Sequence, residues 1–247
     1  MTSAAFDAIA SLVQARAGIV LTPDKDYMLK ARLSPLAERH GLVGLDELAR
    51  RLSAPQSEEL KRQVVEALTT NETSFFRDGA PFERLKSELA RLAAARPGGE
   101  VRLWSAACST GQEAYSVAML TDGMPGLSLS ILGTDLATHV IERAREGLYS
   151  QFEVQRGLPA ALLVKHFRKE GQMWRISDRL RARCRFETGN LLSSFAHLPV
   201  FDVILCRNVL YYFAPATRLG IVSRMLERLS PGGLLMLGST ESVPGPG

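Results

Sequence analysis

The chain has 247 residues, of which 46% are apolar and 23% charged, with a formal net charge of +4. No apolar run approaches the roughly 20 residues that span a bilayer, and an N-terminus with an acid at Asp7 and no basic stretch argues against a secretory signal. Cys108, Cys184 and Cys206 are odd in number and far apart, which predicts a reducing compartment without disulfides. We therefore expect a cytoplasmic globular protein.

The first seventy residues carry apolar side chains at helical spacing and no strand pattern. Ser3 and Thr22 are suited to cap helices at their N-termini, and Pro23 fits a first helical turn. We expect four helices, over about 3–17, 22–39, 46–51 and 57–68. Residues 1–68 are thus predicted to form a small all-helical domain.

Residues 69–80, "TTNETSFFRDGA", are polar and aperiodic, which predicts a linker. From there to residue 247, strand-like runs such as "VRLWSAA", "LSLSILGTD", "FDVILC" and "GLLMLG" alternate with helical stretches. This alternation is typical of βαβ units with a parallel sheet between helices. Residues 81–247 are therefore predicted to form an α/β domain.

A basic segment from Lys165 to Arg185 interrupts this alternation, with eight bases against two acids, a local charge of 8 − 2 = +6. Within it, "RLRARCRF" alternates arginines with apolar residues, and a period of two places all the arginines on one face of a strand. Together with "QMWRI", it predicts an antiparallel hairpin over about 165–188. The arginine face, which comprises Arg179, Arg181, Arg183 and Arg185, either meets an acidic protein surface or is simply solvated.

The stretch "LWSAACSTGQEAYS" predicts a strand, a turn and a helix, with Gly111 at the mouth of the helix. Neither G-x-G-x-x-G nor G-x-x-x-x-G-K-[ST] is present, so the loop is unsuited to phosphates. A nucleoside with an amino-acid tail fits better. Asp135 ends the next strand, 24 residues after Gly111, where a carboxylate can accept hydrogen bonds from both ribose hydroxyls. The alternative is that Asp135 only caps the following helix.

Other predicted strands also end in polar residues. Asn190 follows one strand, and Arg207 and Asn208 follow another. The amide of Asn190 is able to read an adenine edge, although asparagines in loops often only make turns. Because parallel strands end at one edge of a sheet, these residues together predict a nucleoside pocket there.

Five segments resemble the CheR family in their order and spacing: "TNETSFFRD", "VRLWSAACSTGQEAYSVAM", "GTDLATHVIERAREGLY", "GNLL" and "FDVILCRNVLYYF". Members of this family are S-adenosylmethionine-dependent protein-glutamate methyltransferases that act on chemotaxis receptors. The resemblance covers nearly the whole chain. It implies a helical N-terminal domain joined to a class I, Rossmann-like methyltransferase domain, with residues 69–80 as a lid over the site.

The resemblance also implies which residues bind S-adenosylmethionine and its product S-adenosylhomocysteine. By position they are Asn71, Thr73, Arg77, Glu113, Asp135, Asn190, Leu191, Arg207 and Asn208. Arg77 and Tyr212 are implied to position the cofactor and the acceptor, although Tyr212 could equally be a packing aromatic. A glutamate acceptor is already ionised at neutral pH, so no general base is expected. The four histidines lack metal-ligand spacing, and no metal is expected.

The implied partner is the cytoplasmic domain of membrane chemoreceptors, bound by a monomer without membrane insertion or nucleic acid. Lys30, Arg32 and Arg39 on the second helix are expected to help recognise it. The region "FRKEGQMWRISD" is shorter than in relatives that dock on a receptor tail peptide, so such tethering is not expected. The chain also ends soon after "LLMLG", where this type of sheet ordinarily continues with a hairpin, which predicts an open edge strand. Two alternatives remain, a non-catalytic module that binds the cofactor and a nucleic-acid methyltransferase.

Overall fold

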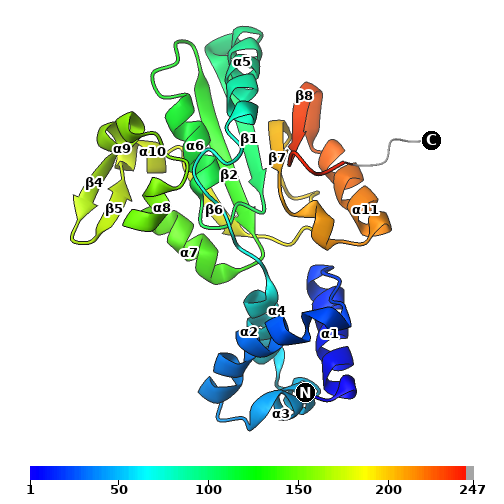
Figure 1. The fold of residues 1–247 in the computed structure, drawn as a ribbon. Coiled ribbons are helices and arrows are strands. Elements are labelled where there is room, and N and C mark those ends of the chain that lie inside the picture. Colours follow the sequence, from blue (N-terminus) through cyan, green and yellow to red (C-terminus); the bar gives the residue numbers. More distant parts are fainter. Residues whose placement is uncertain (243–247) are drawn as a thin grey trace. The chain divides into compact units, whose positions relative to one another are not determined.

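The computed structural model describes residues 1–242 and divides into two compact units (Figure 1). Residues 1–70 and 211–218 form a helical unit, and residues 71–210 and the described residues from 219 onward form a sheet unit. The helical unit contains α1 (Ser3–Ala17), η1 (Pro23–Lys25), α2 (Asp26–Arg39), α3 (Gly44–Leu52) and α4 (Glu58–Leu68). The predicted all-helical N-terminal region is confirmed.

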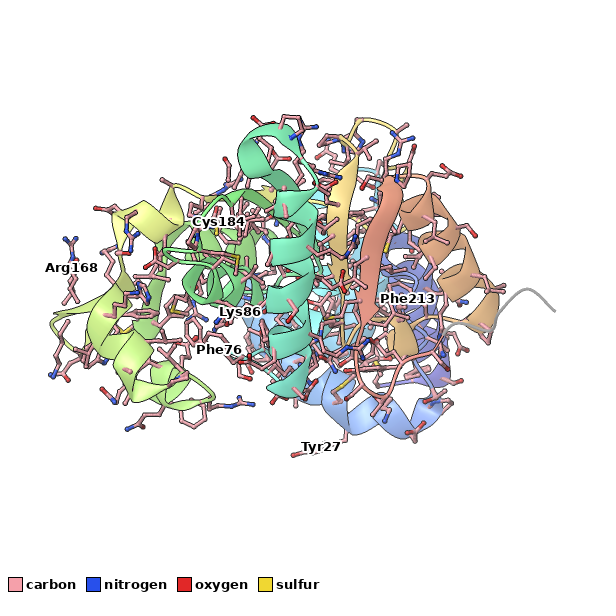
Figure 2. All side chains as sticks on the ribbon, turned by 90° about the horizontal axis from the view of Figure 1, so that it is seen from above. Tyr27, Phe76, Lys86, Arg168, Cys184 and Phe213 are labelled. Carbon is pink, nitrogen blue, oxygen red and sulfur yellow. The ribbon has the colours of Figure 1, made fainter. Side chains whose placement is uncertain are left out.

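Apolar positions at helical spacing bury one face of each helix, as Ile9 and Val13 do on α1 and Leu29 and Leu33 on α2. The opposite faces are polar, although Tyr27 on α2 points outward and is 84% exposed (Figure 2). The cap of α1 is Thr2, not Ser3 as predicted. Ser3 is already helical, whereas the extended backbone of Thr2 lets its side chain accept a hydrogen bond from the Ala5 amide.

The segment 211–218 belongs to the helical unit although it follows a strand of the sheet unit in the chain. Ile19, between α1 and α2, forms an antiparallel bridge with Phe213, and the Val20 amide donates to the Tyr212 carbonyl at 3.2 Å. Phe213 is buried and is labelled in Figure 2. Backbone pairing and burial therefore hold the second half of the "LYYF" motif against the α1–α2 connection.

Two of the basic residues expected to recognise a receptor have partners within the helical unit. The Arg32 guanidinium donates to the carbonyls of Leu68 and Thr69, at 3.2 and 2.7 Å, where α4 ends. Lys30 pairs with Asp26 on the same helix. The Arg32 side chain satisfies free carbonyls at the end of α4, and its expected role in receptor recognition stays a prediction.

The sheet unit is built on five parallel strands in the order β6-β2-β1-β7-β8. Their bounds are β1 (Glu100–Ala106), β2 (Ser128–Asp135), β6 (Cys184–Thr188), β7 (Phe201–Cys206) and β8 (Leu229–Leu237). Its helical elements are α5 (Ala80–Ala94), η2 (Pro97–Gly99), α6 (Gln112–Leu120), α7 (Thr138–Glu146), α8 (Gln151–Gln155), α9 (Ala160–His166) and α10 (Asp178–Arg181); η3 (Leu210–Tyr212) and α11 (Pro215–Leu226) straddle the two units. Every residue of β7 is buried, as expected for a central parallel strand. The predicted α/β architecture is confirmed.

A second, antiparallel sheet has the order β3-β5-β4, with β3 (Leu148–Ser150), β4 (Phe167–Glu170) and β5 (Met173–Ile176). It lies between α7 and β6 in the chain, and Arg168 on β4 points away from it (Figure 2). The inserted hairpin is thus confirmed as an element, but its strands were assigned wrongly. The turn lies at Gly171, and "RLRARCRF" is split between α10 and β6 of the main sheet.

The predicted arginine face does not exist. A helical turn from Asp178 to Arg181 breaks the period of two, because Ser177 and Asp178 favour a helix start. The four arginines have separate partners: Asp122 for Arg179, Asp178 for Arg181, the Ala118 carbonyl and Thr121 hydroxyl for Arg183, and Glu187 for Arg185. Local pairing therefore accommodates this basic segment, and the four arginines form no common binding face.

His166, at the end of α9, is 2% exposed, and both of its ring nitrogens lack a hydrogen-bond partner. The charges that face it are Asp122, whose nearer oxygen is 3.9 Å from Nε2, and the cations Lys165 and Arg179. Arg179 and Lys165 lower the pKa of Asp122 to about 2, so that this carboxylate stays ionised near neutrality. Burial lowers the pKa of His166, and its imidazole is neutral in the folded chain at pH 7.

A protein with a lowered native histidine pKa loses stability as pH falls below the unfolded value of about 6.5, because the unfolded chain binds the proton more readily. We expect the urea midpoint of the wild type to drop between pH 7.5 and 5.5, and His166→Leu to reduce that drop. His197→Leu, at an exposed position, is the control. An equal drop in wild type and His166→Leu would contradict this assignment.

Candidate functional site

The candidate site lies where β1, β2 and β7 end, and its turns have unusual backbone conformations. Within residues 1–242, all non-glycine residues with positive φ fall in three short stretches: Phe76 and Asp78, Ala107 and Ser109, and Asn208. The first precedes α5, the second follows β1 and the third follows β7. Such conformations cost about 1–3 kcal/mol each and persist where the surrounding structure requires them, which is common at functional sites.

Asp135, the last residue of β2, is 7% exposed. Its Oδ2 accepts a hydrogen bond from the Ser109 amide at 2.8 Å, and its Oδ1 accepts one from the Ala137 amide at 3.1 Å. Burial raises the pKa of this carboxyl above its usual value. The Leu136 amide bonds this carboxyl as well, and because a carboxylate has about four acceptor sites, it can still accept a hydrogen bond from a ligand hydroxyl.

Gly111 has a structural role within the protein. It begins α6 with φ +89°, and a Cβ there would lie 3.0 Å from the Ala144 methyl and 3.1 Å from the Phe186 ring. Its missing side chain lets α6 pack against α7 and β6.

The segment 71–78 is anchored along its whole length within the sheet unit. The Asn71 carbonyl accepts from the Ser109 hydroxyl at 2.6 Å, and the Phe76 amide donates to the Ser116 hydroxyl at 2.9 Å. Phe75 is fully buried, with its ring 5.0 Å from that of Tyr149. This stretch of the predicted linker therefore packs as part of the sheet unit.

The Arg207 guanidinium joins three parts of this edge. It donates to Glu113 Oε2 at 3.1 Å, to Asp78 Oδ2 at 2.9 Å and to the Arg77 carbonyl at 2.9 Å. Its side chain is 2% exposed and lies 5.5 Å from the Phe82 ring centroid. Because its terminal nitrogens are bound by protein groups, Arg207 acts here as an anchor for residues 77–78 and for Glu113.

Glu113, at the start of α6, also accepts a hydrogen bond from the Ser105 hydroxyl at 2.7 Å. Its carboxylate is thus held between β1 and β7 with both oxygens oriented. The side chain is 13% exposed and keeps free lone pairs. It can therefore accept hydrogen bonds from an ammonium group at this edge.

Asn190 and Leu191 follow β6 and border a cavity of about 220 Å³. Trp104, Thr134 and Phe195 also line it. Asn190 Oδ1 accepts from the Leu192 amide at 2.9 Å, the turn contact that the sequence alternative anticipated. The pocket is large enough for a ring system beside the strand that ends in Asp135.

The remaining predicted residues are less closely tied to this edge. Thr73 is half-buried in the anchored segment, Asn208 follows Arg207 with φ +58°, and the Arg77 guanidinium donates to the Glu72 carbonyl. Tyr212 belongs to the helical unit. One residue was missed altogether: Glu241 accepts hydrogen bonds from the backbone of the turn after β7, and no sequence pattern marked it.

Residues 4–69 match the family model described as CheR methyltransferase, all-alpha domain, and residues 71–246 match the model described as CheR methyltransferase, SAM binding domain. The chain belongs to the CheR methyltransferase family. The description of the second model confirms S-adenosylmethionine as the cofactor.

Relatives agree with this assignment over nearly the full chain. Chemotaxis protein methyltransferase Cher2 of Pseudomonas putida is 37% identical, over 97% of this chain and 90% of the relative. Chemotaxis protein methyltransferase 1 of Pseudomonas aeruginosa is 38% identical, over 98% and 91%. Chemotaxis protein methyltransferase of Salmonella typhimurium is 38% identical, over 98% and 85%.

The donor set fits S-adenosylmethionine. Asp135 is a buried acceptor of the kind that vicinal hydroxyls require, Glu113 is an oriented carboxylate of the kind that an ammonium requires, and Asn190 borders a cavity. Within the described part of the chain, no group of three or more metal-ligating side chains occurs. None of the helices between residues 1 and 242 is long and apolar enough to cross a membrane.

Removing the Arg207 charge should destabilise the sheet unit strongly. Arg207→Met leaves the Glu113 carboxylate without its cation, and breaking a buried pair costs about 3–5 kcal/mol. Because the second partner, Asp78, is partly exposed, we expect a loss near the lower end of that range. Urea unfolding measures the loss. Arg185→Met, at an arginine with an 80% exposed side chain, should change the free energy of unfolding by under about 0.5 kcal/mol. Similar losses in the two variants would show that Arg207 is not an anchor.

Proposed function

We propose that this protein transfers a methyl group from S-adenosylmethionine to glutamate side chains of chemoreceptors and forms glutamate methyl esters. Membership of the CheR methyltransferase family and the names of its relatives support this function. The observation that carries the proposal is the combination of Asp135 and Glu113, two acceptors suited to the two polar ends of the cofactor.

The reaction needs positioning more than acid–base chemistry. A glutamate carboxylate has a reference pKa near 4.3 and is ionised at neutral pH. S-adenosylmethionine supplies a methyl group on a sulfonium, which becomes a neutral thioether when it leaves. One oxygen–carbon bond forms, one sulfur–carbon bond breaks, and no proton moves. Alignment of the three reacting atoms and removal of water from the carboxylate are the main tasks.

In this proposal each polar group at the edge has one task. Asp135 accepts from the ribose hydroxyls, Asn190 and Leu191 border the base, and Glu113 accepts from the ammonium. Asn71, Thr73 and Asn208 are assigned to the cofactor by their positions in the family motifs. Arg207 keeps Glu113 oriented and offsets its charge, so that an acidic substrate meets less repulsion.

Arg77 and Tyr212 are proposed to position the cofactor and the acceptor glutamate. Arg77 lies in the anchored segment 71–78, and its guanidinium contacts only the Glu72 carbonyl among the hydrogen bonds found within residues 1–242. The proposed partner is the cytoplasmic part of a chemoreceptor, which presents the acceptor carboxylates. The nucleic-acid alternative depended on a common arginine face and loses that support, because those arginines pair separately.

Replacing the ribose acid with the amide of the same size should weaken cofactor binding. In Asp135→Asn the amide nitrogen faces a backbone N–H, and one acceptor is lost. A hydrogen bond to a charged group contributes about 1.5–3 kcal/mol, so the dissociation constant for S-adenosylhomocysteine should rise roughly 10- to 150-fold. Isothermal titration calorimetry measures this change.

Asp202→Asn is a matched control, since Asp202 is also buried and also accepts from a backbone amide, but it lies at the opposite ends of the strands. Asp202→Asn should lower stability and leave cofactor affinity unchanged.

The cofactor affinity of the wild type should fall as the pH drops toward the raised pKa of Asp135, because protonation removes the acceptor. This fall should begin at a higher pH than for an ordinary aspartate. Unchanged affinity in a folded Asp135→Asn variant would refute the ribose assignment.

The linkage formed on the acceptor tests the proposed function directly. After incubation with methyl-labelled cofactor and receptor cytoplasmic fragments, mild alkali should release the label as volatile methanol, because esters hydrolyse and methylated nitrogens do not. Transfer should slow in acid, as the acceptor carboxylate takes up its proton.

Alkali-stable label would exclude a carboxylate acceptor and favour an amine or a nucleobase. Tight cofactor binding without transfer to any receptor fragment would instead favour the non-catalytic module. Asp135→Asn, assayed at a cofactor concentration below its dissociation constant, is the negative control for transfer.

A further inference from the structure

The turn that follows β7 is held by the carboxylate of Glu241. Oε2 accepts from the amides of Asn208 and Gly238 at 2.7 and 2.8 Å, and Oε1 accepts from the amides of Val209 and Leu210 at 2.8 and 2.6 Å. One side chain thus binds four backbone N–H groups, three of them consecutive in the turn. A carboxylate in such a cradle makes charge-assisted hydrogen bonds, which are roughly twice as strong as neutral ones.

The geometry around the carboxylate is built for this contact. Cys206 and Leu237 are paired in the sheet, so Arg207 and Gly238 leave neighbouring strands side by side. A Cβ on residue 238 would lie 2.6 Å from Glu241 Oε2 and 2.9 Å from the Asn208 amide nitrogen, so only glycine fits there. The Glu241 amide also donates to the Gly238 carbonyl at 2.9 Å, which closes the turn that carries the carboxylate.

The held turn is the one with a strained residue and with the buried cation. Asn208 has φ +58°, and the preceding residue is Arg207, whose guanidinium orients Glu113 and residues 77–78. Without an acceptor, the three consecutive amides would lack these bonds, and Asn208 would relax toward an ordinary conformation. The placement of Arg207 would change with it.

We infer that Glu241 is a positioning residue for methyl transfer, which acts by fixing the Arg207–Leu210 turn at the reacting edge of the sheet. This inference deepens the proposed function and rests on it. All the hydrogen bonds found for the Glu241 carboxylate within residues 1–242 go to backbone amides. Its inferred role is therefore to hold the turn, which requires no contact with the cofactor or the acceptor.

The test compares Glu241→Gln with the wild-type chain. Glutamine has the same size, but whichever position its NH2 group takes, it faces two backbone N–H donors and leaves them unpaired. We expect the transfer rate at saturating cofactor and receptor to fall at least tenfold, while the variant remains folded by circular dichroism. Amide exchange at residues 208–210 should become faster by hydrogen–deuterium mass spectrometry.

Glu227→Gln, on an exposed glutamate just after α11, is the matched control and should behave as wild type. If Glu241→Gln does not fold, Gly238→Ala tests the same contact by displacing the carboxylate, with Gly220→Ala as its control, since a Cβ there meets nothing closer than 3.4 Å. At least one of the two contact variants should show the loss of rate with faster local exchange.

A saturating rate within twofold of wild type would overturn the inference, as would a loss of rate that only follows the unfolded fraction. A change confined to the KM for either substrate would overturn it as well, because positioning at the reacting edge must alter the rate of the bound complex. Rates are counted as total label transferred. Alkali-stable label would therefore contradict the carboxylate acceptor, while the ratio of variant to wild type would still test Glu241.

Discussion

A buried guanidinium organises the carboxyl edge of the sheet. Arg207 is almost fully removed from water, and a charge in that position needs partners on several sides. Glu113 from α6, Asp78 and the Arg77 carbonyl supply them. The same contacts fix the segment before α5 against the strand end, so the requirement to satisfy one charge also orders the elements that surround the proposed cofactor.

The strained turns follow from this arrangement. Asp78, Ser109 and Asn208 adopt left-handed conformations in three different segments, and each is held by polar contacts in or beside its turn: Asp78 to Arg207, the Ser109 amide to Asp135, and the Asn208 amide to Glu241. Strain of this kind is retained when several contacts over-determine the backbone. A rigid edge suits a reaction in which alignment, not proton transfer, lowers the barrier.

The acids of this edge fall into two classes with different environments. Asp135 and Glu113 are bound by amides, hydroxyls or the Arg207 guanidinium and can each accept a further hydrogen bond, whereas both oxygens of Glu241 are bound by two backbone amides each. The first two are suited to a ligand and the third to the protein itself. The distinction depends on the neighbouring groups, since the side chains themselves are chemically alike.

The amino-acid sequence by itself determined the two kinds of architecture, the strand ends that carry polar residues and the family. Helical periodicity in residues 1–68 and the alternation of strands and helices beyond residue 80 are local signals, so they could be recognised without knowledge of contacts. Asp135 was found in the same way, from its distance to Gly111. The family motifs located the segment 71–78, because they are themselves stretches of sequence.

Only the tertiary structure decided what each polar group touches. "RLRARCRF" has the period of a strand, but Ser177 starts a helical turn in its first half. Only its last residues, from Cys184 onward, pair with β2 as a parallel strand. Arg32 and Arg207 had the sequence signature of binding residues and proved to satisfy carbonyls and carboxylates of the chain. Glu241 gave no signal, because three of its four partners lie more than thirty residues away and all four are backbone amides, which every sequence has. Periodicity and capping depend on neighbouring residues, whereas the partner of a buried charge depends on which distant segments the fold brings together.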